Sequence, residues 1–571
     1  MCVAKPEGDR GDVELIVIER ECERITKDEC EIGMESLAGL DHAAREIDGD
    51  HLCTTSRQSS TRSAGSSSNI KDPLSWLRRD DLAHLLSPSL GLAKAEKVIE
   101  YVVALRYAIE HARDIFGVLT QVRSSHCPIF TSTRLRQQIE IQCVGILHEG
   151  GVTKMRKMRV RTEVLGDLPH LLEVSIEGAL SNASPTDPIT WVRGDEGMIA
   201  FGEYKRIEIS GSDRFEKARK WWQDSLRELD IHNNVHGSGT GPILFASFAF
   251  DSEEPSTLLI PEVVIGKRGE RRWITWFGDG PQPEVKSIKS ESAPLALRWS
   301  GENGDAWRSH VAAIVDLIQR GEAEKVVLAR ALDGSIEGEQ RIDTRRLLQL
   351  LGSDYPNTWL FSNQGLVGAT PELLVRLSKS LVTSRVLAGT IKRSGDDEKD
   401  LALAASLARS SKDLEEHEYA VRSVADALVP LCSSTNVPES PFVLHLSNVM
   451  HLATDVTGVV TDSVNPPDVF DLLARLHPSA AVCGTPRERA ERSIREVEEI
   501  SRGRYAGPVG WVDIRSDGEF GIALRCGQID ESKKSIRIYA GCGIVAGSDP
   551  AAEYAESEAK LAAIQGALAR H

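Results

Sequence analysis

No stretch of this 571-residue sequence approaches the run of roughly 20 apolar residues that a helix needs to cross a bilayer. The first residues, MCVAKPEGDRGD, lack the basic-then-apolar pattern of a signal peptide. The first 50 residues are also rich in acids, which argues against an organelle transit peptide. We therefore expect a cytoplasmic protein that does not associate with membranes.

Basic charge is also scarce. Lys and Arg number 68 against 85 Asp and Glu, which gives a net charge of −17. A polyphosphate backbone needs a concentrated basic surface, so nucleic acid is not an expected partner. A pocket can still be locally positive inside an acidic protein, so a small anionic substrate remains compatible with this composition.

The ten cysteines follow no recognisable ligand or disulfide pattern. Six of them fall within the first 143 residues, no CxxC pair occurs, and no Cys/His cluster has the spacing of zinc ligands. A chain of this length can bury a large core without a disulfide framework. We expect a reducing, intracellular compartment.

Residues 1–157 read as a poorly defined N-terminal extension. The segment SRQSSTRSAGSSSN at 56–69 has low complexity and predicts disorder, and apolar residues at helical spacing predict a helix over 92–116. One interpretation is a lineage-specific extension. The other, which we favour, is that translation begins at Met155 or Met158 and that the upstream residues are not native.

Residues 158–571 predict one large α+β domain rather than a doubly wound parallel fold. Strand-like segments alternate with turns, and hairpin-like pairs such as GWVDIRSDGEFGIALRCG indicate antiparallel sheets in the core with helices outside. An apolar strand is expected over Lys325–Ala331. Helices are expected over Trp307–Gln319, Lys412–Leu428, Pro467–Leu476 and Ala551–Ala569.

Charged residues at helical spacing suggest a cation site. Glu553, Glu556 and Lys560 stand at i, i+3 and i+7 and share one face of the last expected helix. A solvated charged face would explain them equally well, but two carboxylates one turn apart can also hold a hard cation. Glu416 shares a face with apolar residues such as Val424, and a buried Glu needs a partner or a metal.

Two further residues suit proton transfer. Glu372 follows Pro371 at a turn beside apolar residues, where a raised pKa would make it a general acid; the alternative is a capping residue at the start of a short helix. Lys325, Val327 and Ala329 share one face of an alternating strand. A lysine on an inward face would be desolvated and so become a candidate base, whereas an ordinary strand-edge lysine is the simpler alternative.

Nine segments in this order resemble the chorismate-utilising enzymes, which comprise isochorismate, salicylate, anthranilate and aminodeoxychorismate synthases. They are KVVLAR, GATPELL, LAGTIKRS, KDLEEHE, MHLATDVTG, LHPSAAVCGTPR, YAGPVGWVD, IALRCG and AGCGIVAGSDPAAEYAESEAK. The resemblance covers about residues 300–565, and a looser likeness extends back to about 185. Within the family, the sequence is most similar to isochorismate synthases. It implies a large, two-lobed catalytic domain that takes chorismate and Mg²⁺.

The resemblance also implies a role for each matching residue. Lys325 would deprotonate a water that attacks C2 of chorismate, and Glu372 would protonate the departing C4 hydroxyl. Glu416 and Glu556 would bind magnesium, with Glu553 as a ligand directly or through water. The residues expected to bind the substrate are Gly389, Thr390, His451, Arg525, Gly541, Gly543 and Lys560.

The choice within the family rests on the nucleophile. Anthranilate and aminodeoxychorismate synthases use ammonia, whereas the lysine in KVVLAR activates water, so we expect no glutaminase subunit and a monomer or homodimer. Salicylate synthase, which eliminates pyruvate from isochorismate, stays open as an alternative, as does an inactive binding or regulatory homologue. Whether the product feeds menaquinone, a catechol siderophore or salicylate is also left open. Cys542 and Cys483 depart from the family pattern, which has Ala and a Ser- or Thr-like residue at these positions.

Overall fold

A computed structural model describes residues 157–177, 187–289, 295–301, 303–461 and 464–571, which belong to one unit of the chain, Lys157–His571. The low-complexity segment at 56–69 and the helix expected over 92–116 lie outside the described residues. The predictions made for the N-terminal extension therefore stay predictions.

Two large sheets form the centre of this unit, and their strands pair antiparallel except for β1 with β6. In spatial order, the larger sheet contains β12 (Leu297–Gly301), β13 (Lys325–Ile336), β25 (Ser535–Ile544), β24 (Cys526–Asp530), β15 (Leu366–Thr370), β14 (Trp359–Asn363), β3 (Ile189–Arg193), β4 (Glu196–Phe201), β9 (Val263–Arg268), β10 (Arg271–Phe277), β1 (Met158–Val164) and β6 (Leu229–Asn233), with β21 (Gly484–Thr485) on β13.

The second sheet contains β18 (Cys432–Asn436), β20 (Val449–Val460), β17 (Leu381–Lys392), β16 (Leu373–Ser378), β23 (Gly518–Ile522), β22 (Pro508–Asp513), β7 (Ile243–Ser247), β8 (Ser256–Ile260) and β5 (Lys205–Ile209), with β19 (Phe442–His445) on β20. A separate pair joins β2 (Val174–Glu177) to β11 (Glu284–Ser287). The predicted α+β class with antiparallel sheets is confirmed.

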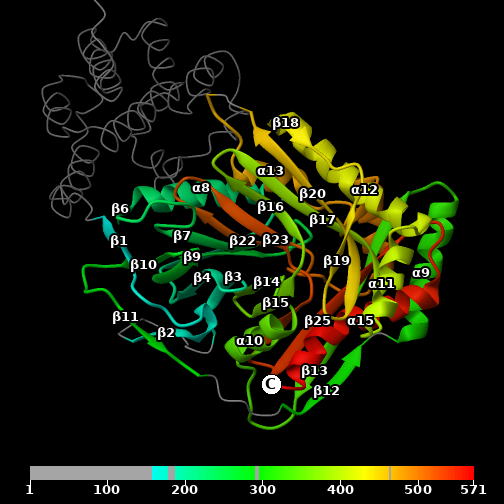
Figure 1. Cartoon of the computed structure of the whole chain (residues 1–571), viewed down its shortest axis with the longest axis horizontal. Helices are drawn as coiled ribbons and strands as arrows, with labels where there is room; N and C mark the ends of the chain where they lie inside the picture. The colour runs from blue at the N-terminus through cyan, green and yellow to red at the C-terminus, as the bar shows by residue number, and fades with distance from the viewer. Residues whose placement is uncertain (1–156, 178–186, 290–294, 302, 462–463) are drawn as a thin grey trace, which may run out of the picture. The chain divides into compact units, whose positions relative to one another are not determined.

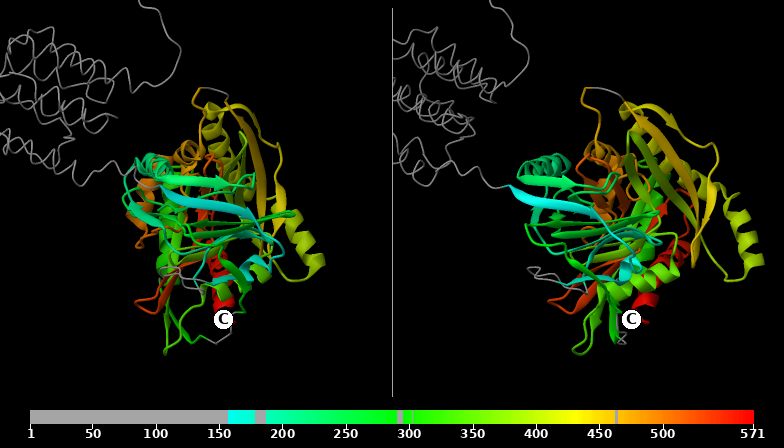
Figure 2. Two further views of the ribbon diagram at one scale, coloured as in Figure 1. Left: turned by 90° about the vertical axis from the view of Figure 1, so that its left-hand side faces the viewer. Right: turned by 60° about the vertical axis from the view of Figure 1, so that its left-hand side comes forward.

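The described helices are α8 (Arg214–Arg227), α9 (Gly304–Gln319), α10 (Thr344–Asp354), α11 (Asp397–Leu407), α12 (Ser411–Leu428), α13 (Val469–Leu476), α14 (Arg487–Val497) and α15 (Pro550–Leu568), with short 3₁₀ turns η3 (Leu171–Glu173) and η4 (Val429–Leu431). All four expected helices are confirmed, as α9, α12, α13 and α15. Helices α9, α11, α12 and α15 gather on the right-hand side of Figure 1. In the turned views of Figure 2, the C-terminal helix, drawn in red, lies beside the strands.

Capping residues explain where several of these helices begin. Ser410 accepts a hydrogen bond from the backbone N–H of Asp413, and Asp549 accepts one from Ala552, which satisfies donors that a helix start leaves open. Pro550 follows Asp549 in the first turn of α15, where its missing N–H costs nothing. The residues of the expected cation site, Glu416 on α12 and Glu553 and Glu556 on α15, therefore lie on helices with defined starts.

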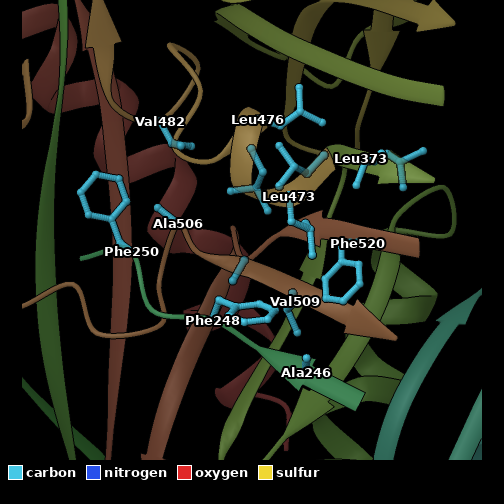
Figure 3. Packing of buried hydrophobic residues seen from close by; sticks show 14 of the residues in the cluster. Ala246, Phe248, Phe250, Leu373, Leu473, Leu476, Val482, Ala506, Val509 and Phe520 are labelled. Atoms are coloured by element: carbon cyan, nitrogen blue, oxygen red, sulfur yellow. The ribbon is translucent and has the colours of Figure 1, made fainter. Parts of the chain in front are cut away.

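The main core unites apolar side chains from both sheets and from α13. Phe248, Phe520 and Val509 pack with Leu373 and Leu473 in this cluster, and all five are buried (Figure 3). The rings of Phe248 and Phe520 lie 6.2 Å apart between centroids. Trp191 on β3 and Phe361 on β14 of the larger sheet belong to the same cluster, so this core holds the two sheets together.

A buried carboxylate also ties the two sheets together. Glu519 on β23 accepts hydrogen bonds from the indole N–H groups of Trp191 on β3, at 2.9 Å, and Trp359 on β14, at 2.6 Å. The guanidinium of Arg376 donates to its second oxygen at 2.5 Å. A buried charge with this many donors is fully satisfied, so it orders the interface between the sheets.

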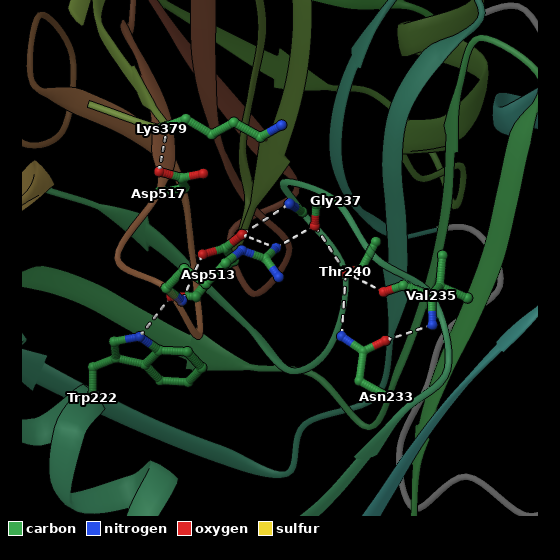
Figure 4. A network of polar contacts seen from close by, with 10 residues as sticks. Trp222, Asn233, Val235, Gly237, Thr240, Lys379, Asp513 and Asp517 are labelled. Atoms are coloured by element: carbon green, nitrogen blue, oxygen red, sulfur yellow. Dashed lines mark hydrogen bonds and ion pairs between the residues drawn. The ribbon is translucent and has the colours of Figure 1, made fainter. Parts of the chain in front are cut away.

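Away from that interface, Asp513 lies at the end of β22, where it contacts α8 and two loops (Figure 4). Its Oδ2 accepts from the backbone N–H of Gly239 at 3.0 Å and from Arg515 at 2.6 Å, and its backbone carbonyl accepts from the Trp222 indole at 3.3 Å. This network anchors α8 to the second sheet.

Within the described residues, no helix is long and apolar enough to cross a membrane.

Candidate active site

One cavity brings together most of the predicted site residues. The nine that line it are Glu372, Gly389, Thr390, Glu416, His451, Arg525, Gly541, Gly543 and Lys560. Lys325, Glu553 and Glu556 do not line it directly. Lys325 pairs with Glu416 and Glu556 pairs with Lys560, so both contact the cavity wall.

Glu372 lies in the turn between β15 and β16. Its backbone N–H donates to the Thr370 hydroxyl at 3.3 Å, and that hydroxyl donates to the carbonyl of Ile522 at 2.6 Å, which fixes the turn. Strand β16 follows directly, so the interpretation of Glu372 as the cap of a short helix is wrong. Burial raises the pKa of Glu372 to about 8, although a hydrogen bond from the Leu387 backbone and the charges of nearby cations act in the opposite direction. The carboxyl therefore keeps its proton at neutral pH.

Lys325 is the first residue of β13 and is fully buried. Its Nζ lies 3.3 Å from Oε1 of Glu416 on α12. The adjacent backbone belongs to Gly543, where a Cβ atom would stand 2.1 Å from Glu416 Oε1 and 2.9 Å from Lys325 Cε. Only a glycine lets this ion pair approach the strand so closely. The interpretation of Lys325 as an ordinary edge lysine is wrong.

A bulge in β17 turns Thr390 toward the cavity. Gly389 has φ +76°, and the pairing with β20 shifts register between Ala388 and Thr390. The Thr390 hydroxyl lies 3.0 Å from Nδ1 of His451, and Nη2 of Arg525 lies 3.0 Å from Nε2 of the same ring. Arg525 itself has φ +47°, a left-handed backbone that glycine adopts more readily.

His451 is neutral in this arrangement. Burial, together with the charges of Arg525 and Lys560, lowers the pKa of His451 well below its usual value. Because the guanidinium of Arg525 can only donate, Nε2 of His451 accepts, and Nδ1 carries the proton toward Thr390. The histidine thus orients the guanidinium without adding charge to the cavity.

The glycines of β25 turn backbone groups away from β13. Val327 and Ala329, which pair with Gly543 and Gly541, send their N–H groups away from β25, to Cys483 O and to a carboxylate oxygen of Glu498, both at 2.7 Å. In an antiparallel pair whose two residues are not hydrogen-bonded to each other, both residues direct their backbone N–H and C=O groups away from the partner strand. Gly541 and Gly543 therefore direct these groups away from β13. The carbonyl of Gly541 accepts there from Lys560 Nζ at 2.8 Å.

Three side chains on β25 and α15 could hold a cation. A carboxylate oxygen from each of Glu553 and Glu556 and the sulfur of Cys542 lie within 4.8 Å of one another. Glu416 is not part of this group, but its charge is one of the causes that raise the pKa of Glu553, after burial and Glu556. Burial has the largest effect on Glu556 and raises its pKa, but Lys560, Lys412 and a hydrogen bond from Thr390 together lower it below the usual value. These carboxylates therefore fit a divalent cation, and the interpretation as a solvated charged face is wrong.

Glu553, Glu556 and the nearby Glu416 each have a lysine partner. Lys412 Nζ lies 2.6 Å from Glu553 Oε1, Lys560 Nζ lies 2.5 Å from Glu556 Oε1, and Lys325 serves Glu416. The sequence interpretation missed Lys412, although it stands four residues before Glu416 on the same helix face.

Two more residues of the wall escaped the sequence interpretation. Tyr505 is buried and stacks on Tyr539 with 4.8 Å between ring centroids. Arg502 donates to the carbonyls of Val327 and Val482 at 2.8 and 2.9 Å, so it fixes the two stretches of backbone that flank the cavity. Tyr505 begins the YAGPVGWVD motif and Arg502 lies three residues before it, so proximity to this motif was the sequence signal that could have identified them.

A buried protonated acid, a buried lysine and a set of paired carboxylates around one cavity define an enzyme that acts on a small anionic substrate. Residues 187–277 and 281–569 match the family model described as chorismate binding enzyme, and the chain belongs to that family. The family is metal-dependent.

Named relatives agree with this assignment. The chain is 31% identical to the isochorismate synthase MenF of Bacillus subtilis over 392 residues, which are 62% of this chain and 82% of that protein. It is 33% identical to the isochorismate synthase DhbC of the same organism over 408 residues, or 69% and 94% of the two chains. The solved structure of the menaquinone-specific isochorismate synthase MenF of Escherichia coli shares the fold, with a TM-score of 0.59 at 22% identity over 75% of this chain and 99% of that one.

Proposed function

We propose that this protein is an isochorismate synthase, which converts chorismate to isochorismate by adding water at C2 and expelling the C4 hydroxyl. The observation that carries the proposal is the burial of Glu372 in the wall of a cavity that is also lined by Glu416, the partner of the fully buried Lys325. Hydroxide is a poor leaving group and water a poor nucleophile, so this reaction needs one proton donor and one proton acceptor.

Glu372 is the proposed general acid. Its pKa of about 8 keeps a proton available at neutral pH, and its side chain faces the cavity. Donation of that proton to the C4 oxygen makes the leaving group water rather than hydroxide. The resulting carboxylate is stabilised by the nearby cations Lys325, Arg525 and Lys560.

Lys325 is the proposed base that takes a proton from the attacking water. It is fully buried and Glu416 is the carboxylate that its Nζ contacts. When Glu416 turns toward a cation, Lys325 loses this partner and its amine becomes available to the cavity. The acid comes from the turn between β15 and β16 and the base from β13, which suits proton transfer at two different ring carbons.

Arg525, Lys560 and the outward N–H groups of Gly541 and Gly543 are the proposed contacts for the substrate carboxylates. A guanidinium suits a carboxylate because both are planar forks, and His451 holds this one in place. Thr390 and Gly389 complete the wall. Arg525 and Lys560 both line the cavity, so an anionic substrate is electrostatically favoured there.

Mg²⁺ is the proposed cation, held by Glu416 and Glu556, with Glu553 as a ligand directly or through water. When bound, it would orient a substrate carboxylate and disperse its negative charge. The oxygen-rich donor set on α12 and α15 supports a hard cation. Because water is the nucleophile, the enzyme needs no glutaminase subunit.

The test is an assay of the purified full chain with chorismate and Mg²⁺, followed by chromatography of the products. We expect isochorismate as the product and loss of activity on chelation, with recovery when Mg²⁺ is restored. Salicylate with an equal amount of pyruvate would instead identify a salicylate synthase, and unchanged chorismate would contradict the proposal.

A further inference from the structure

Cys542 lies between the two glycines of β25 but faces the other way. Side chains alternate along a strand, so Cys542 points away from the side that Gly541 and Gly543 present to the cavity. Its thiol donates to the backbone carbonyl of Glu553 at 3.3 Å, and the residue is 1% exposed. The sulfur therefore sits beneath the first turns of α15, which carry the two carboxylates.

The three ligand atoms are close enough to share one ion. The sulfur of Cys542 and one oxygen each from Glu553 and Glu556 lie within 4.8 Å of one another. With Zn–S near 2.3 Å and Zn–O near 2.0–2.2 Å, ligand atoms around a tetrahedral zinc stand roughly 3–4 Å apart. The lysine contacts are no obstacle, because a carboxylate offers about four lone-pair positions.

We propose that Cys542, Glu553 and Glu556 form a binding site for a thiophilic divalent cation such as Zn²⁺, and that this cation competes with Mg²⁺ for the two carboxylates. The inference rests on the proposed function insofar as it assigns Mg²⁺ to Glu553 and Glu556. Zn²⁺ bound through Cys542 on β25 would then inhibit the enzyme by displacing Mg²⁺.

The chemistry of the ligands separates the two cations. Mg²⁺ takes oxygen ligands, whereas a thiolate favours Zn²⁺ and other soft ions. When Zn²⁺ binds, the S–H bond is replaced by an S–Zn bond and the proton leaves to solvent. Without such an ion, the Cys542 thiol donates its hydrogen to the backbone carbonyl of Glu553, and sulfur is not a ligand that Mg²⁺ favours.

Cobalt(II) is a coloured probe for this site, because a thiolate bound to Co²⁺ gives a charge-transfer band in the near ultraviolet. The metal-free full chain is titrated with Co²⁺ in reducing buffer, and the spectrum is compared with those of Cys542→Ala and Cys542→Ser. We expect a band that both variants lose and that Zn²⁺ or excess Mg²⁺ displaces. Displacement by Mg²⁺ separates this thiol from the six cysteines in the first 143 residues.

Cys526→Ala is the matched control. Cys526 lies on the neighbouring strand β24, is also buried, and its thiol also donates to a backbone carbonyl, that of Ala523, at 3.3 Å. Within the described residues, Cys526 is not part of a group that could hold a metal. The control should retain the band, which shows that removing a buried thiol does not by itself abolish it.

Calorimetry supplies the second readout. In Cys542→Ala the Zn²⁺ affinity should fall by at least about tenfold, the loss that even an outer partner of a metal site can cause, while Mg²⁺ affinity changes little. Equal cobalt bands in the wild type and Cys542→Ser, or a Cys542-dependent band that Mg²⁺ does not displace, would overturn the inference. Failure of the wild type to bind Mg²⁺ or to form isochorismate counts against the proposed function instead, and the cobalt comparison distinguishes the two failures.

Discussion

Lys325 on β13 and Glu416 on α12 form an ion pair with 3.3 Å between Nζ and Oε1, and the lysine is completely buried. The two residues are 91 positions apart, and Gly543 on a third element provides the space they occupy. This pair links the proposed base to a proposed metal ligand, so changes to either should affect both proton transfer and cation binding.

Lys325→Ala should reduce kcat by about 10²–10⁴, the usual contribution of a general base. The change should not weaken Mg²⁺ binding, because it removes a cation that competes for Glu416. Steady-state kinetics and calorimetry on the same preparation test both expectations, with exposed Lys379→Ala as the control. Near-normal turnover of Lys325→Ala would show that another group is the base.

Gly543→Ala tests the same pair without removing a charge. Its Cβ atom would stand 2.1 Å from Glu416 Oε1, so the carboxylate and the lysine must move apart. We expect loss of most activity and weaker Mg²⁺ binding. Gly547→Ala, where a Cβ atom meets nothing within 4 Å, is the matched control and should behave as wild type. Full activity of Gly543→Ala would mean that the position of Glu416 is not critical.

The pKa of Glu372 predicts the alkaline limb of the pH profile. A general acid must be protonated, so kcat should be maintained below about pH 8 and fall above it as Glu372 ionises. Glu372→Gln should lose about 10²–10⁴ in kcat and should no longer show this limb in its residual activity. A wild-type profile that rises through pH 8 would contradict the assignment.

The same pKa shift has a signature in stability. The unfolded chain ionises this carboxyl near 4.5 and the folded protein near 8, so between these values the folded state holds more protons. The free energy of unfolding must then fall as the pH rises through this window. Glu372→Gln removes that dependence, so its Tm relative to wild type should be higher at pH 8.5 than at pH 4.5. An equal difference at both pH values would contradict the shift.

Lys412→Met should tighten Mg²⁺ binding and lower the Tm of the metal-free protein. Its Nζ lies 2.6 Å from Glu553 Oε1, so the lysine neutralises this buried carboxylate until a cation arrives. Lys412→Arg keeps the charge and should leave the Mg²⁺ affinity close to that of the wild type. Calorimetry and thermal melts of the metal-free variants measure both effects. Weaker Mg²⁺ binding by Lys412→Met would instead make the lysine a support of the metal site.

The helices and strands that the sequence predicted correctly are those that a local pattern of apolar residues defines. Apolar spacing located α9, α12, α13 and α15, and the alternation in KVVLAR located the start of β13. Helix α14 was not expected, because its segment RERAERSIREV has few apolar residues and buries only Ala490, Ser493 and Ile494. These three positions share one helix face, but the stripe holds only two apolar side chains among many charged ones, so it was not recognised as a helix.

The pairing of site residues could not be read from the sequence, because it depends on tertiary packing. Glu553 and Glu556 share a helix face by spacing alone, and that much was predictable. Their lysine partners come from different places: Lys412 from another helix and Lys560 from the next turn. Cys542 was noticed only as a departure from a motif, and its distance to the carboxylates follows from how α15 packs on β25.

The most direct test of the central claim is turnover of chorismate in water enriched with ¹⁸O, with mass analysis of the isochorismate formed. A water activated by Lys325 and a C4 hydroxyl expelled with a proton from Glu372 require one solvent oxygen in the new C2 hydroxyl of every product molecule. Product with ¹⁸O at the enrichment of the solvent would support this account. Isochorismate without ¹⁸O would mean that the hydroxyl migrates within the substrate, and would contradict it.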